Sequence, residues 1–495
     1  MNDRPSVALR IDKRVERVVA PRIEWAFGLY CVVAGLRVLA PARADLVVRY
    51  GGEPQDGEVP VPATYRARPA GTAAPAPVIT TPLARDGSLR SLPCFHPVAA
   101  TGPDLLGEIF EWVSADHERS ITASDAVGRI PFAETLQGRY GLSPSVPWAT
   151  EAMRWLHALL AAAWDRSPNW PGTLAGPLGR PVVAATHDLD FLPGRAWQTG
   201  VRYAKNLAFA VARERSIVPQ VVAAGASTVL GRHPLDRLEW MVGREQELGI
   251  RSSVNVLCRR AHRRDANYAL SEARTQRRLR WLVDHGIEVG LHGSYTSLEG
   301  PGRLAREYAA LRKVGLDAHG GRQHWLRYRD TRLFAELEQA GALYDSSAGF
   351  AEQPGFRHGA SFPFPPWDFE REQPFPLLEI PLAVMEAALG GHDAPALAHT
   401  VLKNAVANDW GAVAVLWHDP VFGGTQCDRR VADLYWELKR PGQDWLSPLE
   451  LALAVWPAYT DCGLLPAPGE SSALRPAPAV SAAFEPSRGN ELAEL

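Results

Sequence analysis

The chain is poor in cysteine and has no excess of charge of either sign. Its 495 residues include five cysteines, none in a C-x-x-C spacing, which argues against a disulfide framework and against a cysteine zinc site. The 53 basic and 55 acidic residues leave a net charge of −2, so composition gives no reason to expect a nucleic-acid partner. The sparse cysteines fit a reducing compartment, and we expect a cytoplasmic protein.

Long apolar runs and several familiar catalytic signatures are also missing. The best membrane candidate, residues 25–40, is too short to span a bilayer and contains Arg37, so neither a membrane span nor a signal peptide is expected. No G-x-G-x-x-G follows a predicted strand, and no G-x-S-x-G, Walker loop or H-E-x-x-H occurs. These absences count against dinucleotide enzymes, serine esterases, NTPases and zincins.

From residue 181 onward, short apolar runs alternate with helical patterns. Seven such runs occur: PVVAATHD, IRSSVNVL, IEVGLHG, AHGGRQHW, ALYDSS, LLEIPLAV and AVAVLWHD. This alternation predicts a parallel α/β fold. We expect a distorted or partly open seven-stranded parallel β/α barrel, preceded by a smaller α/β domain. The expected divisions are an N-terminal α/β accessory domain at 1–166, a breaker-rich linker at 167–180, the barrel at 181–458 and a disordered tail at 459–495.

Polar side chains gather where these runs end. They include Asp188, Asp190, His292, Arg322, His324, Asp345, His418 and Asp419. In a parallel barrel the C-terminal strand ends form one face, so we expect these residues to converge on one pocket. A carboxylate with imidazoles suits zinc or a similar divalent ion, and a second, unligated carboxylate can act as general base.

Four short motifs in this order resemble the polysaccharide deacetylases of the NodB-homology superfamily, a family of metal-dependent carbohydrate esterases. They are T-H-D-L-D ending at Asp190, G-L-H-G-S-Y-T-S around His292, R-Q-H-W at 322–325, and L-W-H ending at His418. The resemblance spans residues 181 to about 425, over half the chain. It implies a hydrolase that removes an acetyl group from an N- or O-acetylated sugar in bacterial polysaccharide metabolism.

The resemblance also implies a role for individual residues. Asp188 would be the general base, His418 the general acid, and Arg322 the residue that orients the base. Asp190 and His292 would bind the metal, with zinc expected and cobalt, nickel or manganese as alternatives. The substrate would be a glycan or sugar conjugate, and the expected substrate-binding residues are Tyr295, Trp325, Arg357 and Trp417.

The second motif departs from the family pattern. The family has a further histidine four positions after the first, and here that position is Thr296. We expect His324 to supply the third ligand; Ser294, Thr296, water, or loss of the metal are the alternatives. Two rival functions stay open: hydrolysis of another non-peptide C–N bond on the same barrel, and a catalytically inactive carbohydrate-binding homologue.

Three further features have alternative interpretations. The basic runs at 259–265 and 274–280 could bind an anionic glycan or a lipid-linked diphosphate, but a solvated face is preferred. His187 faces away from Asp188 in a regular strand, so a structural role is expected. The aromatic loop that follows Arg357 could line a sugar site or form a satellite hydrophobic cluster.

Overall fold

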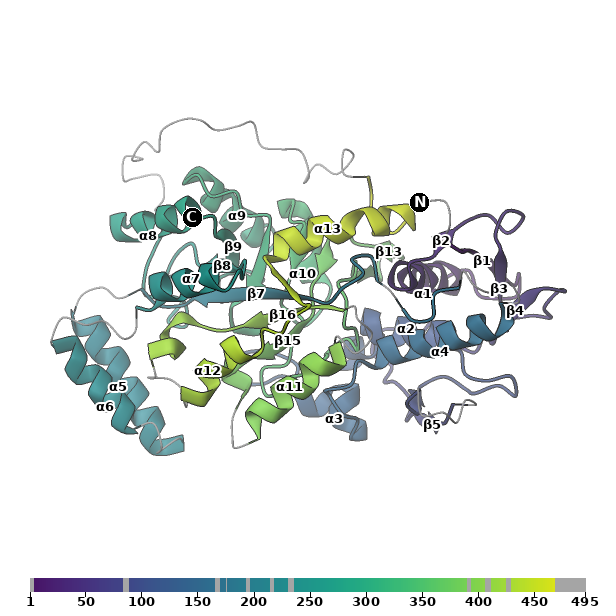
Figure 1. Cartoon of the computed structure of the whole chain (residues 1–495), viewed down its shortest axis with the longest axis horizontal. Helices are drawn as coiled ribbons and strands as arrows, with labels where there is room; N and C mark the ends of the chain where they lie inside the picture. Colours follow the sequence, from purple (N-terminus) through teal and green to yellow (C-terminus); the bar gives the residue numbers. More distant parts are fainter. Residues whose placement is uncertain are drawn as a thin grey trace.

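The computed structural model describes residues 4–82, 89–164, 170–174, 176–192, 196–213, 218–229, 236–389, 393–405, 411–423 and 429–467. Two α/β regions lie side by side along the long axis of the molecule (Figure 1). One is built from the first 164 residues, and the other begins at residue 182. The expected linker at 167–180 is only partly described.

A parallel sheet forms the second region. Its strands are β7 (Val182–Leu189), β8 (Ser253–Val256), β9 (Glu288–Gly293), β10 (Gly320–Gln323), β11 (Tyr344–Asp345), β14 (Leu378–Glu379), β15 (Leu382–Met385), β16 (Ala412–Leu416) and β17 (Asp444–Leu446). All of their pairings are parallel. Every residue of β7 is buried, as expected for a parallel strand covered on both faces.

The sheet curls so far that its two edge strands, β14 and β15, follow one another directly in the chain. The strand order is β14-β11-β10-β9-β8-β7-β16-β15, with β17 paired to the start of β7. Only Ile380 and Pro381 separate β14 from β15. The Ile380 N–H donates to the Asp345 carbonyl (2.8 Å), and the Pro381 carbonyl accepts from the Ala414 N–H (2.8 Å). The expected distorted parallel barrel is therefore confirmed, but its sheet has nine strands among the described residues in place of the expected seven. The sixth expected strand is present as two short strands, and β17 is additional.

Helices surround this sheet, as an alternating pattern requires. They are α7 (Leu238–Glu247), α8 (Ala273–Asp284), α9 (Arg303–Lys313), α10 (Arg332–Ala340), α11 (Ala394–Ala405), α12 (Arg429–Glu437) and α13 (Pro448–Asp461). Short 3-10 helices follow some strands, at His324–Leu326, Glu386–Ala388 and Asp419–Gly423. A two-strand ribbon, β12 (Trp367–Asp368) with β13 (Gln373–Pro374), lies between β11 and β14 in the chain. The insertion after β7 forms the helical hairpin of α5 (Ala196–Arg213) and α6 (Val218–Val229), which projects from the body in Figure 1.

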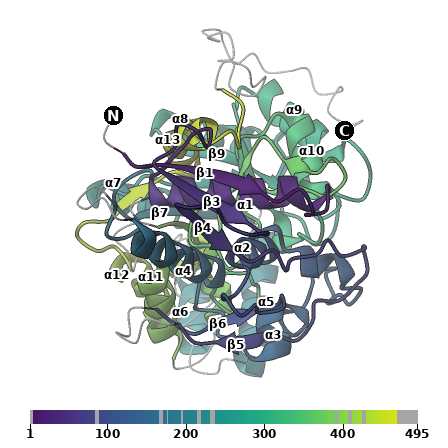
Figure 2. The ribbon, with the colours of Figure 1, turned by 90° about the vertical axis from the view of Figure 1, so that its right-hand side faces the viewer.

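The N-terminal region has its own small parallel sheet. Its order is β2-β1-β3-β4, built from β1 (Ser6–Ile11), β2 (Arg37–Val38), β3 (Leu46–Tyr50) and β4 (Glu58–Val61). The helices are α1 (Val19–Ala34), α2 (Leu105–Ser114), α3 (Leu136–Tyr140) and α4 (Trp148–Ala163), with 3-10 helices at Asp116–Ser120 and Phe132–Glu134. A separate ribbon pairs β5 (Val78–Thr80) with β6 (Leu92–Cys94). Figure 2 shows this region face on.

The two regions share one hydrophobic core. A single cluster of buried residues includes Trp25 and Phe110 from the N-terminal helices and Trp367 from the barrel region. The ring centroids of Trp25 and Phe110 lie 5.5 and 5.6 Å from that of Trp367. The architecture therefore changes around residues 167–180, but one hydrophobic core continues from the first region into the second.

The expected start of the disordered tail, at residue 459, is wrong, because the chain is ordered beyond that position. Helix α13 continues to Asp461, and Tyr459, Leu464 and Leu465 are buried. Leu464 packs against Gly28 of α1, where an added Cβ would lie 2.9 Å from the leucine side chain. Apolar burial against the N-terminal region orders this stretch, and residues 468–495 lie outside the described part of the chain.

A buried ion pair also joins the two regions. The Arg357 guanidinium donates to both carboxylate oxygens of Glu118, at 2.9 and 2.7 Å, and both side chains are almost fully buried. Burial alone would raise the pKa of Glu118, but the Arg357 charge outweighs it and lowers that pKa. Arg357 also lies over the Tyr328 ring, 4.5 Å from its centroid.

We predict that Arg357→Met destabilises the protein far more than Arg139→Met. The first change leaves the Glu118 carboxylate buried without its partner, a loss of about 3–5 kcal/mol. The second breaks a partly exposed pair with Glu134, which is worth about 0–1 kcal/mol. Urea unfolding followed by tryptophan fluorescence measures both. Equal losses for the two variants would contradict the structural role of Arg357.

Candidate metal centre

The barrel brings the sequence-predicted chemical residues to one end of the sheet. Asp188 lies near the end of β7, Arg322 pairs in register with His292 across β10 and β9, and His418 comes two residues after β16. His324 begins the 3-10 helix directly after β10. The pocket at this end measures about 360 Å³, and its lining includes Asp188, Asp190, His292, His324 and His418.

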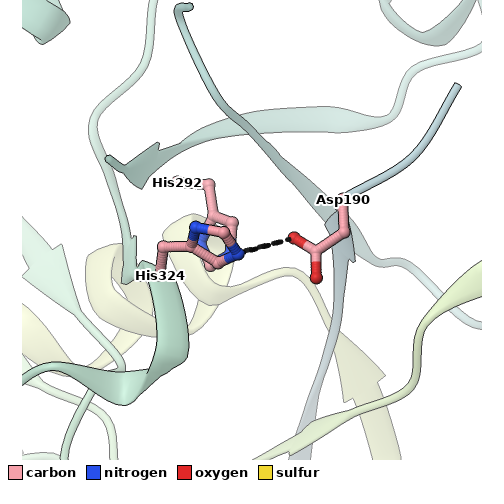
Figure 3. Close-up of side chains that lie close together, drawn as sticks. All are labelled: Asp190, His292 and His324. Atoms are coloured by element: carbon pink, nitrogen blue, oxygen red, sulfur yellow. Dashed lines mark ion pairs between the residues drawn. The ribbon is translucent and has the colours of Figure 1, made fainter. Parts of the chain in front are cut away.

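Asp190, His292 and His324 form a group that could hold a metal ion. Their ligand atoms all lie within 4.8 Å of one another. Asp190 Oδ1 is 3.4 Å from the Nε2 atom of each histidine (Figure 3). Ligands about 2.0–2.1 Å from a tetrahedral ion lie roughly 3.3 Å apart by geometry, so these separations match a zinc-type site. Asp190 Oδ1 is buried and has no hydrogen-bond partner among the described residues, as expected of a ligand atom.

The charges in this group also favour a cation. Burial alone would raise the pKa of Asp190, but the neighbouring imidazoles lower it well below its ordinary value. Burial alone would lower the pKa of His324, but the Asp190 and Asp265 carboxylates raise it to about 9. Two carboxylates thus hold positive charge at His324, and a proton and a divalent ion would compete for its Nε2 atom.

Both histidine ligands are fixed from behind. The Nδ1–H of His292 donates to the Arg322 backbone carbonyl (2.9 Å), which leaves the Nε2 lone pair facing Asp190. His324 Nδ1 lies 3.5 Å from Asp265 Oδ1. Asp265 is itself fixed by the backbone N–H groups of Tyr295 (2.8 Å) and His262 (2.7 Å). This arrangement is the outer support that metal-binding histidines ordinarily have.

His324, and not Thr296 or Ser294, completes the group with Asp190 and His292. Neither Thr296 nor Ser294 lines the pocket. Ser294 is buried, and its hydroxyl donates to Glu307 Oε1 while its N–H donates to Glu307 Oε2 (2.9 Å). The hydroxyl is therefore engaged away from the group formed by Asp190, His292 and His324.

Asp188 is held ionised beside this group. Its Oδ1 atom accepts from Asn255 Nδ2 (2.8 Å) and from the Arg322 guanidinium (3.1 Å). Burial alone would raise the pKa of Asp188, but the neighbouring His292 and Arg322 side chains lower it. Its other oxygen, Oδ2, lies 3.7 Å from His292 Nε2 at the pocket. Gly290 leaves room for the Asn255 side chain that donates to Asp188, because a Cβ at position 290 would lie 2.2 Å from the Asn255 side-chain oxygen.

His418 forms the opposite side of the pocket. Its Nδ1 atom bonds to the Glu386 carboxylate (2.6 Å), and its Nε2 atom lies 3.6 Å from Asp190 Oδ2. Burial alone would lower the pKa of His418, but the Glu386 carboxylate, with Asp190, raises it to about 10. The imidazole is therefore oriented and charged as a proton donor toward the pocket.

The turn that carries His324 has an unusual backbone. Trp325 and Leu326 have φ values of 64° and 52°, in the left-handed region that non-glycine residues rarely adopt. Each such residue costs about 1–3 kcal/mol unless its surroundings hold it. The Trp325 indole donates to the Arg264 carbonyl (3.3 Å), and the Trp325 carbonyl accepts from Arg129 (3.1 Å).

Of the four expected substrate-binding residues, Trp325 lines the pocket and is about half exposed. Tyr295 does not line the pocket, and its hydroxyl accepts from Arg264 (2.8 Å). Arg357 and Trp417 are corrections, because they lie in the core and neither lines the pocket. Arg357 pairs with Glu118, and the fully buried Trp417 donates to the Val431 carbonyl (2.9 Å) and packs on Tyr435.

His187 and the aromatic loop lie in the core. The His187 ring contacts the Trp417 carbonyl (2.6 Å) and the Glu245 carboxylate (2.9 Å), away from the pocket, which agrees with a structural role. The loop residues Phe362, Phe364 and Trp367 belong to the shared hydrophobic cluster and not to the pocket lining.

Sequence reasoning missed Asn255, Asp265, Glu386 and Arg129. Asn255 lies inside a run that reads as a strand, so a polar side chain in that apolar run is the available signal. Asp265 ends a basic run for which the sequence favours a solvated face, although its side chain is fully buried. Glu386 follows β15, and Arg129 comes from the N-terminal region, so only the folded chain places them here.

No protein-family model matches the chain, and no curated protein matches its sequence. Among solved structures, a Mycobacterium smegmatis protein assigned as a polysaccharide deacetylase is 18% identical, with a TM-score of 0.34, over 56% of this chain and 91% of its own. A Pseudomonas aeruginosa protein with the same assignment is 14% identical, with a TM-score of 0.34, over 59% and 97%. An allantoinase, Puue, is 12% identical, with a TM-score of 0.35, over 59% and 94%. These similarities are too low to assign a function, so the conclusions below rest on the strand order and on the geometry of the site.

We predict that His324→Ala loses the bound metal, whereas Thr296→Ala retains it. Only the first change removes one of the three facing ligand atoms. Metal content after dialysis, measured by mass spectrometry, tests both variants. Full metal in His324→Ala would show that another group supplies the third ligand.

Asp265→Asn is expected to weaken metal binding by about 10- to 100-fold without abolishing it, because Asp265 supports His324 from behind. Competition with a fluorescent chelator measures the affinity. Asp317→Asn is the matched control, since that exposed carboxylate pairs with His319 away from the pocket. Unchanged affinity in Asp265→Asn would contradict the supporting role.

Proposed function

We propose that this protein is a metal-dependent hydrolase that removes an acetyl group from an N- or O-acetylated sugar. The single observation that supports this most is the buried Asp190 Oδ1 atom, which has no hydrogen bond among the described residues and faces two imidazole Nε2 atoms, beside an ionised Asp188 and a charged His418. The proposed ion is zinc, held by Asp190, His292 and His324. Such an ion supplies Lewis acidity, which polarises a carbonyl and makes nearby water more acidic.

Asp188 is the proposed general base. Asn255 and Arg322 occupy its Oδ1 atom, so Oδ2 remains to accept a proton from water in the pocket. Its depressed pKa keeps the carboxylate ionised at neutral pH. Arg322 acts as a positioning residue, because it also donates to the Ser346 carbonyl (2.7 Å) and cannot swing away.

His418 is the proposed general acid. Its Nε2 atom faces the pocket, and Glu386 both orients the ring and keeps it protonated. A proton delivered from this atom converts the departing sugar nitrogen or oxygen into a neutral amine or alcohol. The apolar lining residues Leu326, Met385 and Leu416 offer space for the acetyl methyl group.

Acetate release is the test of this function. We expect zinc-loaded protein to release acetate from an acetylated oligosaccharide such as tetra-N-acetylchitotetraose, and Asp188→Asn to lose at least about 100-fold in rate while it keeps its zinc. Asp317→Asn is the control with unchanged rate. Formate or ammonia release from other C–N substrates, without acetate release from any acetylated sugar, would favour the rival hydrolase function.

The pH dependence of the rate tests the partnership of His418 with Glu386. Because the Glu386 carboxylate raises the pKa of His418, Glu386→Gln lowers that pKa, and the imidazole loses its proton at a lower pH. A general acid works only while protonated, so we expect the alkaline fall in activity to move to lower pH. A profile with an unmoved alkaline limb would assign the proton donor elsewhere.

A further inference from the structure

A loop of the N-terminal region forms part of the rim of the pocket. Residues 121–130 lie on the barrel face, held by arginine side chains that donate to the loop carbonyls. Arg329 donates to Ile121 (2.7 Å) and Ala123 (3.1 Å), and Arg264 donates to Ala126 (3.2 Å). The Tyr295 hydroxyl also donates to the Val127 carbonyl (3.5 Å).

Arg129 is the residue of this loop that lines the pocket. Asp125 accepts from its Nε (2.8 Å), and the Trp325 carbonyl accepts from its NH1 (3.1 Å). Asp125 also accepts from the Val127 and Arg129 N–H groups (both 2.9 Å), so the turn itself is fixed. A guanidinium has five N–H donors, and these contacts leave donors for a ligand in the pocket.

More arginines lie next to Arg129 on this rim. Arg264 lies 5.0 Å from the centroid of the Tyr295 ring and 5.9 Å from that of Trp325. Arg259, Arg260 and Arg263 are exposed in the same segment, which follows the C-terminal end of β8. The basic run at 259–265, for which a solvated face is preferred on sequence, therefore lies next to the pocket, because Arg264 contacts Trp325 and Trp325 lines the pocket.

The rim segments carry more positive than negative charge. Residues 121–130, 259–265, 295–300 and 325–330 contain seven arginines and four carboxylates. Two of those carboxylates pair with rim arginines, Asp125 with Arg129 (2.7 Å) and Glu299 with Arg327 (3.4 Å). Asp265 is buried behind His324, and Asp330 lies 3.9 Å from Arg332. All four rim carboxylates therefore have partners other than the exposed arginines of 259–263.

We propose that the substrate is a sugar that carries an acidic group, a carboxylate or a phosphate, and that Arg129 and Arg264 bind that group at the rim. Arginine is the side chain best suited to such oxygens, because its planar donors match them in pairs. Trp325 offers the sugar ring an aromatic face between the two arginines. This proposal rests on the proposed function only in taking the ligand to be a sugar.

Direct binding tests the charge preference separately from catalysis. Titration calorimetry in a zinc-loaded Asp188→Asn background compares hyaluronan tetrasaccharide, which carries carboxylates, with neutral tetra-N-acetylchitotetraose. N-acetylglucosamine 1-phosphate and N-acetylglucosamine form the matching phosphate pair. We expect at least one acidic probe to bind about tenfold tighter than its neutral partner, because hydrogen bonds between a guanidinium and an anionic oxygen are stronger than those to neutral groups.

The variants locate that preference. Arg129→Gln combined with Arg264→Gln is expected to remove most of it, whereas Arg139→Gln, remote from the pocket, keeps it. Thermal unfolding of the double variant checks that the protein is folded, and Arg129→Gln alone provides a milder change. Higher salt should weaken binding of the acidic probe more than that of the neutral one, because exposed charges are screened.

Each outcome has a defined meaning. A preference within the hyaluronan pair identifies a carboxylate, and one within the phosphate pair identifies a phosphate. Equal binding within both pairs, or a preference that survives in the double variant, overturns the proposal. Failure to release acetate from any sugar, with the preference intact, overturns the proposed reaction and leaves the acidic ligand standing.

Discussion

The buried Oδ1 atom of Asp190 is the atom on which the rest of the site depends. A carboxylate oxygen without a hydrogen bond is costly in a protein interior unless positive charge compensates it. Two imidazole Nε2 atoms face this oxygen at 3.4 Å, and each ring is oriented by a group on its far side. The space between these three atoms therefore favours a cation. Beside it, Asp188 and His418 are kept in their charged forms by neighbouring side chains.

Those partners show how the fold supplies precision. The Arg322 carbonyl fixes the tautomer of His292 while the Arg322 side chain holds Asp188, so one residue links the proposed base to a proposed metal ligand. In-register pairing of Arg322 with His292 makes this double contact possible. Asp265 and Glu386 play comparable parts for His324 and His418. Each support comes from a strand end or the segment just after it, where a parallel barrel gathers side chains.

The N-terminal region belongs to the same functional unit. It shares the hydrophobic core with the barrel, contributes Glu118 to a buried ion pair, and sends the 121–130 loop across to the pocket. The Trp325 turn illustrates the consequence. Its left-handed backbone follows His324 directly, and the Trp325 carbonyl is held by Arg129 from the first part of the chain. The pocket lining and the placement of His324 therefore both involve residues far apart in sequence.

The sequence by itself determined the parallel barrel and most of the inner residues of the site. Alternation of apolar runs with helical patterns is a local property. Each of Asp188, Asp190, His292, His324 and His418 lies at or just after the end of a run that reads as a strand. Only the tertiary structure decided the rest. The sixth run splits into β14 and β15 because the sheet must curl back on itself. Arg357 and Trp417 turn into the core, while Arg129 and Glu386 turn into the pocket. Side-chain direction after a strand ends depends on contacts between distant segments, and the sequence pattern does not record those contacts.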